Sequence, residues 1–172
     1  MRNNRSLGFI VALVVFALDQ LAKWIVTGPL QIQNMEHFYL LPIFQFTYTQ
    51  NNGISLGLLN ATNPLGRWML VLLTSAIAVG VAFWMSREES RLDRFALGMV
   101  LGGALGNILD RTLHGYVVDF LDLHFGETRP FLIFNVGDAA ISIAVVILLL
   151  HAFLSRKDEA KGSSPKEIHE DA

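Results

Sequence analysis

The chain has 172 residues, of which 52% are hydrophobic and 16% carry a charge, with a formal net charge of -2. This length suits one domain, and the composition is too apolar for an ordinary soluble domain, which favours a membrane protein. The absence of cysteine excludes disulfides, cysteine-ligated zinc, iron–sulfur clusters and thiol nucleophiles, as well as anchoring through a lipid-modified cysteine of its own.

Four segments are long and apolar enough to cross a membrane, whose hydrocarbon core of about 30 Å requires about 20 residues of helix. They run from about residue 7 to 26, 68 to 85, 95 to 113 and 131 to 154. The first follows Arg2 and Arg5 as a signal peptide would, but it is long and lacks a small-residue cleavage site, so we expect it to be retained. The predicted fold class is a membrane all-α four-helix transmembrane bundle.

Basic residues predict the orientation of the spans, because cytoplasmic loops are enriched in lysine and arginine. Most of them lie before span one, between spans two and three, or after span four, namely Arg2, Arg5, Arg87, Arg91, Arg94, Arg156, Lys157, Lys161 and Lys166. Only Arg67 and Arg129 lie in the segments on the opposite side. Both termini are therefore expected to be cytoplasmic, and residues 156–172 are expected to form a disordered tail after a single domain of residues 1–155.

The outer segment of about residues 28–66 is predicted to be rich in β-structure. Residues 44–49 alternate aromatic and polar side chains, which is a strand pattern with one apolar face. The sequence Asn51-Asn52-Gly53 then supplies a turn signal. We therefore expect a small antiparallel sheet on the outer surface of the membrane.

Span three carries Gly98, Gly102 and Gly106 at intervals of four residues, which places them on one helix face. Small residues on one face allow a second helix to approach closely within a membrane. We interpret this stripe as a packing surface. Gly103 lies beside it, near the polar residues described next.

Polar residues within the spans are the main indication of function, because ionisable groups in a membrane are costly and usually face a bundle interior or a wet cavity. Three spans each carry such a group on one helix face. The members are Asp19 and Lys23 in span one, Asn107, Asp110 and Arg111 in span three, and Asn135 and Asp138 in span four.

Counting along the helices places these groups at one depth. With a rise of about 1.5 Å per residue, Asp19 and Asn107 lie roughly 18 Å from the cytoplasmic end, and Asp138 lies roughly 10 Å from the outer edge. In a core of about 30 Å all three fall in the outer third. Asp119 follows span three by a few residues and returns to the same interface. The pattern predicts one site that opens towards the outer side.

The residue types in this site favour hydrolysis by paired carboxylates. The five histidines show no metal-ligand spacing, so neither a metal nor another cofactor is expected. Two neighbouring aspartates share a proton, so one can activate water while the other protonates the carbonyl or the leaving group. Position alone leaves the pair open, because Asp122 and Asp110 compete with Asp119. Of these, Asp110 is expected to form a structural ion pair with the adjacent Arg111.

Five stretches form motifs in a fixed order, namely Asp19-Gln20-Leu21-Ala22-Lys23, Asn51 to Ser55, Gly102 to Arg111, Val118-Asp119-Phe120 and Phe134 to Asp138. In residues and spacing they resemble lipoprotein signal peptidase, the bacterial signal peptidase II family. The resemblance implies a four-span aspartic endopeptidase with a small periplasmic sheet, the β-cradle, that removes signal peptides from prolipoproteins. It implies substrates with diacylglycerol on the lipobox cysteine, and cleavage just before that cysteine at the outer leaflet of the bacterial inner membrane.

The resemblance also implies residue roles, with Asp119 and Asp138 as the catalytic pair. Substrate-binding or site-positioning roles fall on Asn51, Gly53, Asn107, Arg111 and Asn135, while Asp19, Lys23 and Asp110 are interpreted as structural. The family usually has alanine where this chain has Gly137, and alanine and phenylalanine where it has Ile54 and Leu56. These replacements stay small or apolar, so we expect catalysis to be retained.

The expected partners are lipidated prolipoproteins and membrane lipids, with no nucleic acid, and the expected oligomeric state is a monomer. The alternative function is a small proton-coupled transporter or channel subunit, since intramembrane carboxylates also relay protons. A transporter should carry polar residues through the full depth of its spans, whereas the inner halves of these spans are nearly wholly apolar. A presenilin-like protease would hold both aspartates within helices, whereas Asp119 lies outside the predicted ones.

Overall fold

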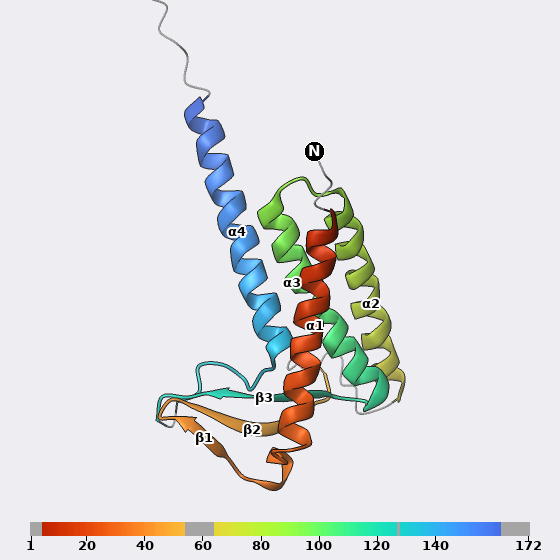
Figure 1. The fold of residues 1–172 in the computed structure, drawn as a ribbon, viewed down its shortest axis with the longest axis vertical. Coiled ribbons are helices and arrows are strands. Elements are labelled where there is room, and N and C mark those ends of the chain that lie inside the picture. Colours follow the sequence, from red (N-terminus) through yellow and green to blue (C-terminus); the bar gives the residue numbers. More distant parts are fainter. Residues whose placement is uncertain (1–4, 54–63, 127, 163–172) are drawn as a thin grey trace, which may run out of the picture.

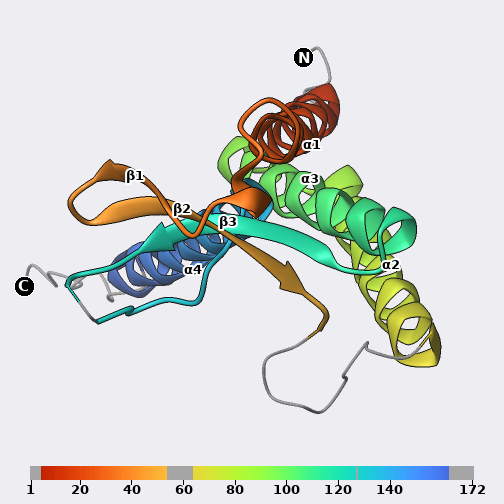
Figure 2. The same ribbon diagram turned by 90° about the horizontal axis from the view of Figure 1, so that it is seen from below.

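The computed structural model describes residues 5–53, 64–126 and 128–162. Among them, four helices are long and apolar enough to cross a membrane. They are α1 (Arg5–Thr27), α2 (Pro64–Arg87), α3 (Arg91–Leu113) and α4 (Val136–Gly162). The helix α3 packs against the other three and lies at the centre of the bundle in Figure 2. The predicted four-helix membrane bundle is confirmed.

A three-stranded antiparallel sheet lies across one end of the bundle (Figures 1 and 2). Its strands are β1 (Phe38–Leu41), β2 (Phe44–Asn51) and β3 (Val117–Leu123), and β2 is central. The strand expected at residues 44–49 is confirmed as part of β2, and a short 3-10 helix, Ile32–Asn34, precedes β1. The family departures at Ile54 and Leu56 lie outside the described residues.

The strand β3 lies after span three, where the sequence analysis predicts no strand. The strand pairs with β2 from Val117 opposite Asn51 to Leu123 opposite Phe44. On the other side of β3, the N–H and carbonyl of Phe134 exchange backbone hydrogen bonds with Leu121 at 3.1 and 2.8 Å. Because Phe134 is held in this extended pairing, α4 begins at Val136 instead of near residue 131.

Both ends of the described chain lie away from the sheet. The first turn of α1 and the carboxyl-terminal end of α4 are at the opposite end of the bundle in Figure 1. The helix α4 continues to Gly162, beyond the domain boundary expected at residue 155. The remainder of the expected tail, residues 163–172, lies outside the described residues.

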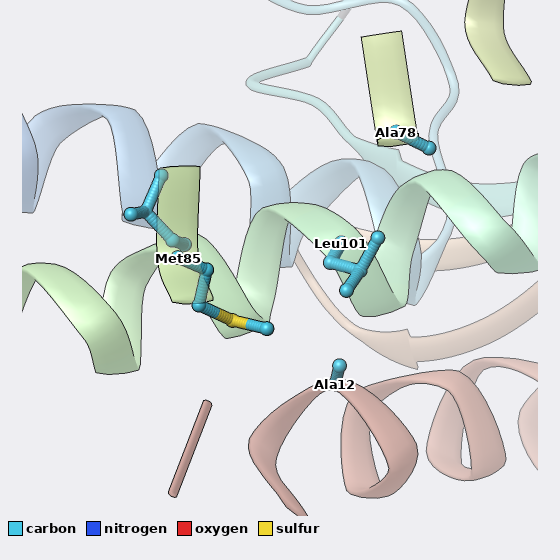
Figure 3. Packing of buried hydrophobic residues seen from close by; sticks show 5 residues of the cluster. Ala12, Ala78, Met85 and Leu101 are labelled. Carbon is cyan, nitrogen blue, oxygen red and sulfur yellow. The ribbon is translucent and has the colours of Figure 1, made fainter. Parts of the chain in front are cut away.

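The core between the helices combines alanines with larger apolar side chains. Ala12 of α1, Ala78 and Met85 of α2 and Leu101 of α3 are buried against one another (Figure 3). Small residues let helix backbones approach closely, which is how helices associate in a membrane where burial of apolar surface gives little advantage. The alanines in this core therefore suit a bundle that packs within lipid.

The glycine stripe of α3 sets how closely α1 approaches. A β-carbon at Gly98 would meet the carbonyl oxygen of Gly8, and one at Gly102 would meet that of Ala12. One turn further along, Gly106 leaves room for the carboxylate of Asp19. The prediction that this stripe is a packing surface is confirmed.

Gly103, beside the stripe, performs the same role towards α4. A β-carbon at Gly103 would meet the backbone of Gly137, and one at Gly137 would lie 3.0 Å from the carbonyl oxygen of Gly103. The glycine at position 137, where the family usually has alanine, thus lies at the closest approach of α3 and α4. The close approach of α3 to α1 and its close approach to α4 together bring polar residues of the three helices within hydrogen-bond reach.

We expect Gly102→Ala to lower the free energy of unfolding by about 1–3 kcal/mol, because the added methyl group must displace the backbone of α1. The matched control is Gly80→Ala in α2, where a β-carbon has no neighbour within 4 Å. Alanine favours a helix over glycine by about 0.5–1 kcal/mol, so the control should be neutral or stabilising. Thermal unfolding in detergent would compare them, and equal melting temperatures would contradict the close packing.

Candidate active site

A buried ammonium group lies where α1, α3, α4 and β3 meet. The Nζ atom of Lys23 is 2.6 Å from Oδ2 of Asp19 and 2.9 Å from Oδ2 of Asp110, and all three side chains are buried. The expected pair between Asp19 and Lys23 is confirmed. The expected pair between Asp110 and Arg111 is wrong, because the cation beside Asp110 is Lys23. Adjacent residues of a helix point in different directions, so Arg111 cannot share the face of Asp110.

The two carboxylates of this cluster extend to the segments that carry Asp119 and Asp138. Asp19 accepts a hydrogen bond of 2.8 Å from the backbone N–H of Gly137 in α4. Asp110 accepts one of 3.1 Å from the backbone N–H of Val118 in β3. Each structural carboxylate thus holds the residue immediately before a predicted catalytic aspartate.

The side chain of Asn107 links the same cluster directly to Asp138. Its Oδ1 atom accepts hydrogen bonds from Nζ of Lys23 at 3.3 Å and from Nδ2 of Asn135 at 3.0 Å. Because the oxygen is used twice, the amide nitrogen points the other way and donates to Oδ1 of Asp138 at 2.8 Å. Lys23 therefore helps to fix which end of the amide faces the carboxylate.

Asp138 occupies the first turn of α4, and Asn135 caps this helix. The backbone N–H of Asp138 donates to Oδ1 of Asn135 at 2.9 Å, and the backbone N–H of Asn135 donates to Oδ2 of Asp138 at 3.3 Å. This reciprocal pair is a capping box, which satisfies donors that every helix leaves free at its start. The same local bonds therefore start the helix and orient the carboxylate.

Asn135 is also the bridge between the two predicted catalytic residues. It is fully buried, and its Nδ2 atom donates to Oδ1 of Asp119 at 2.7 Å while its Oδ1 accepts from Asp138. The second carboxylate oxygen of Asp119 accepts from Nδ2 of Asn51 at 2.9 Å. Asn51 is in turn oriented by the backbone N–H of Gly53, which donates to its Oδ1 at 3.1 Å. The predicted residues Asn51, Gly53 and Asn135 thus meet at Asp119.

The surroundings of Asp119 favour its protonated form. Burial and the nearby charge of Asp138 raise the pKa of Asp119 from its ordinary value of 3.8 to about 6, against the opposing effect of the bonds from Asn51 and Asn135. No cation lies within ion-pair distance of Asp119 among the residues that the structure describes. A carboxyl group with a pKa near neutrality can both accept and donate a proton in a reaction.

Asp122, the competitor on the same strand, has the opposite surroundings. It is fully buried and accepts hydrogen bonds from Gln45 at 2.8 Å, from Thr47 at 3.0 Å and from Arg129 at 3.2 Å. Although burial raises it, these bonds hold the pKa of Asp122 below its ordinary value. Asp122 therefore stays an ionised acceptor with a permanent partner. The sequence analysis did not identify Gln45 or Thr47 as partners of Asp122. Their alternation with aromatic residues indicated only a strand.

Arg111 lies on the side of α3 that faces the aspartates. Its charge interacts with those of Asp138, Asp119 and Asp110, although no carboxylate is within ion-pair distance of it in the described part of the chain. Its buried Nε atom has no hydrogen-bond partner among the described residues. A guanidinium held beside a carboxylate pair with an unused donor is suited to binding another acceptor.

Two cavities adjoin the pair, and Phe131 and Leu132 line both of them. The larger one, of about 690 Å³, combines polar and apolar groups: it is lined by Asp119, with Asn51, Thr47 and Thr49 of β2 and the segment from Arg129 to Ile133. An apolar one of about 330 Å³ is lined by Asp138, with residues that include Leu132, Phe134 and Ile143. No group of three or more histidine or acidic side chains is arranged to hold a metal ion in the described residues. The site can hold a substrate that is apolar on one side and polar on the other.

The family described as signal peptidase (SPase) II matches residues 11–154 of this chain. Two relatives are both described as lipoprotein signal peptidase. The one from Sphingopyxis alaskensis is 50% identical over 147 residues, which cover 86% of this chain and 85% of the relative. The one from Rhizorhabdus wittichii is 48% identical over 154 residues, which cover 90% of each chain.

Two solved structures share the fold, and both are described as bacterial membrane enzymes studied by the in meso method. The one at 2.3 Å resolution has a TM-score of 0.75 and 25% sequence identity, and the match covers 94% of this chain and 93% of that one. The one at 1.9 Å resolution has a TM-score of 0.72 and 26% identity, and the match covers 84% of this chain and 91% of that one. Four apolar helices with a small sheet are thus an arrangement found in membrane enzymes.

Removing the buried cation should destabilise the whole site. In Lys23→Met, Asp19 and Asp110 lose their shared partner, and breaking a buried ion pair costs about 3–5 kcal/mol. Adding Asp19→Asn and Asp110→Asn to that variant should restore part of the loss, because the amides carry no charge. Thermal unfolding in detergent would measure all three proteins, and a wild-type melting temperature for Lys23→Met would contradict this account.

The raised pKa of Asp119 predicts a specific dependence of stability on pH. Because its pKa is 3.8 when unfolded and about 6 when folded, the folded chain binds more protons between these values. Stability should therefore fall as the pH rises through this window, and Asp119→Asn should lack that component. For Asp122, whose folded pKa is lowered, the sign is reversed, so Asp122→Asn should lose stability relative to wild type as the pH rises. Melting temperatures measured from about pH 2 to pH 7 would decide, because the window of Asp122 lies below the ordinary pKa of 3.8 and that of Asp119 lies above it; curves parallel to that of wild type for both variants would refute the assignment.

Proposed function

The chain belongs to the signal peptidase II family, and we propose that Asp119 and Asp138 are its catalytic pair. As a member of this family it is an aspartic peptidase that removes signal peptides from prolipoproteins. It is a multi-pass membrane protein with four candidate spans. The transporter and presenilin-like alternatives are therefore set aside. The observation that carries the proposal is the bridge that Asn135 forms between the two carboxyl-bearing segments.

We infer that the protein lies in the bacterial inner membrane, with both termini cytoplasmic and the sheet on the periplasmic side. The positions of the start of α1 and of the end of α4, both opposite the sheet, support this orientation. The basic residues near those ends support the cytoplasmic assignment. We also propose a monomer as the working form, because one chain contains both aspartates and the residues that position them.

We further infer that the substrate carries diacylglycerol on the lipobox cysteine and is cleaved just before that residue. The apolar cavity beside Asp138 supports an apolar substrate segment within the membrane. The polar side chains in the cavity beside Asp119, among them Thr47, Thr49 and Arg129, support a polar segment outside the membrane. A cleavage point at the junction of a hydrophobic signal peptide and a polar mature chain fits this division.

The proposed reaction is a general acid–base attack by water. The two carboxyl groups share one proton and hold a water molecule between them; one deprotonates it as it attacks the scissile carbonyl. The other protonates the carbonyl oxygen and, later, the leaving nitrogen. The proton belongs to the pair as a unit, as expected for two coupled carboxyl groups. No metal or other cofactor takes part in this scheme.

Positioning roles follow from the hydrogen bonds around the pair. Asn107 and Asn135 hold Asp138, while Asn51 and Asn135 hold Asp119, so each carboxylate keeps a fixed orientation. Arg111 is proposed to bind a carbonyl oxygen of the substrate, since its Nε has no partner in the described residues. Lys23, with Asp19 and Asp110, supports these residues from behind without touching the substrate.

Replacing either aspartate of the pair by asparagine should abolish cleavage, because one acid–base group of the two is lost and rate losses of 10²- to 10⁴-fold, or more, are usual for such groups. Purified protein would be incubated with a lipidated and an unlipidated prolipoprotein, and cleavage followed by gel shift. We expect wild type to cleave only the lipidated form.

The matched control is Asp93→Asn, which removes a carboxylate that contacts His151 at 2.8 Å and lies outside the proposed site. It should retain cleavage, and the melting temperatures of all variants would show that they are folded. Wild-type-like processing by Asp119→Asn or Asp138→Asn would overturn the catalytic assignment. Equal cleavage of both substrate forms would overturn the requirement for lipid.

A further inference from the structure

One cation lies in the larger cavity, which Asp119 also lines, and the catalytic scheme does not use it. Arg129 lines this cavity, and its side chain is 49% exposed. Its Nε atom donates to both carboxylate oxygens of Asp122 at 3.2 Å. Among the described residues this is the only side-chain hydrogen bond of Arg129, so the donors on its two terminal nitrogens are available for another acceptor.

Asp122, the buried partner of Arg129, is held in place by further hydrogen bonds. Asp122 is fully buried and also accepts hydrogen bonds from Gln45 and Thr47 of β2. A guanidinium tied by Nε to such an anchor keeps its orientation, so little conformational freedom is lost when it binds a second group. Arg129 is thus a preorganised cation at the wall of the substrate cavity.

Spacing along β3 indicates which part of a substrate would meet this cation. Asp119 and Asp122 are three residues apart on the strand, which corresponds to about 10 Å at a rise of about 3.3 Å per residue. A substrate that lies extended along the sheet advances by the same amount per residue. The residue near Arg129 would therefore be about three positions from the bond that is cleaved next to Asp119.

The two cavities indicate the direction of the substrate. The apolar cavity at Asp138 suits the signal peptide, whereas the cavity with Thr47, Thr49 and Arg129 also offers polar side chains, which suit the mature chain that follows the cleavage point. The side chain recognised at Arg129 is then one of the mature protein. A planar guanidinium with two free nitrogens matches a carboxylate, which it can bind through two parallel hydrogen bonds.

We propose that Arg129, held by Asp122, is a specificity-determining residue that binds an acidic side chain about three residues after the scissile bond. The proposal rests on the function proposed above and adds to it a preference among prolipoproteins. A phospholipid phosphate would also attract a guanidinium, but Arg129 shares its cavity with Asp119, Asn51 and Thr49, which favours the substrate chain as its ligand.

The test uses lipidated prolipoproteins that carry Asp, Asn or Lys in turn at the second to fifth residues after the scissile bond. Cleavage by the full-length protein would be measured as kcat/KM in phosphatidylcholine vesicles. We expect wild type to prefer Asp over Asn by about tenfold at the third or fourth position, which corresponds to about 1.4 kcal/mol, and to disfavour Lys. In Arg129→Gln the ratio of Asp to Asn should fall to about one, while Arg129→Lys should keep an intermediate ratio.

The matched control is Arg87→Gln, which removes an exposed arginine stacked on Phe83 at the far end of α2 and should keep the wild-type ratio. Because each ratio is measured within one variant, partial misfolding does not change it. An Asp-to-Asn ratio of one for wild type at all four positions, or an unchanged ratio in Arg129→Gln, would overturn the proposal.

Repeating the assay with phosphatidylglycerol in the vesicles separates the lipid from the substrate. If the effect of Arg129→Gln follows the anionic lipid and not the substituted residue, the ligand is a lipid phosphate and the proposal is wrong. Failure of the function itself has a different signature, because wild type would then cleave none of the lipidated substrates.

Discussion

The polar interior of this protein depends on the buried ammonium of Lys23. A charge within a membrane is costly unless oppositely charged and polar groups surround it, and here Asp19, Asp110 and the amide oxygen of Asn107 do so. Each of these partners also holds a segment with a proposed catalytic aspartate, through Gly137, Val118 or Asp138 itself. One electrostatic requirement therefore fixes α1, α3, α4 and β3 relative to one another.

Close helix packing is the condition under which this network can form. Aspartate and asparagine have short side chains. They can form hydrogen bonds between two helices only where the helix backbones lie close together, as they do at the level of the site. Gly106 admits the carboxylate of Asp19, and Gly103 admits the backbone of Gly137. The glycines thus act on catalysis indirectly, because a wider separation of α3 from either neighbour would break the bonds that orient the aspartates.

Local patterns predicted the spans, the strand at residues 44–49 and the common depth of the polar groups, because hydropathy and helical rise depend only on neighbouring residues. They failed where the partner is distant in sequence. The partner of Asp110 is Lys23 and not the adjacent Arg111, and β3 was missed because its mostly apolar run lacks the alternation of a half-buried strand. The start of α4 is a further example. Phe134 pairs with β3, which is distant in sequence, so the helix starts after Asn135, which caps it.

The strand β3 shows how two identical residues acquire different chemistry three positions apart. Asp122 receives three side-chain donors, one of which is the cation Arg129, so it stays charged. Within the described residues, Asp119 receives two neutral amide donors and lies near the charge of Asp138. The unfavourable charge at Asp119 is tolerated because Val118, its neighbour, is bonded to the carboxylate of Asp110 in the Lys23 cluster. Stability supplied by one buried ion cluster thus maintains a carboxyl group in a protonation state near balance, which is the state that acid–base catalysis requires.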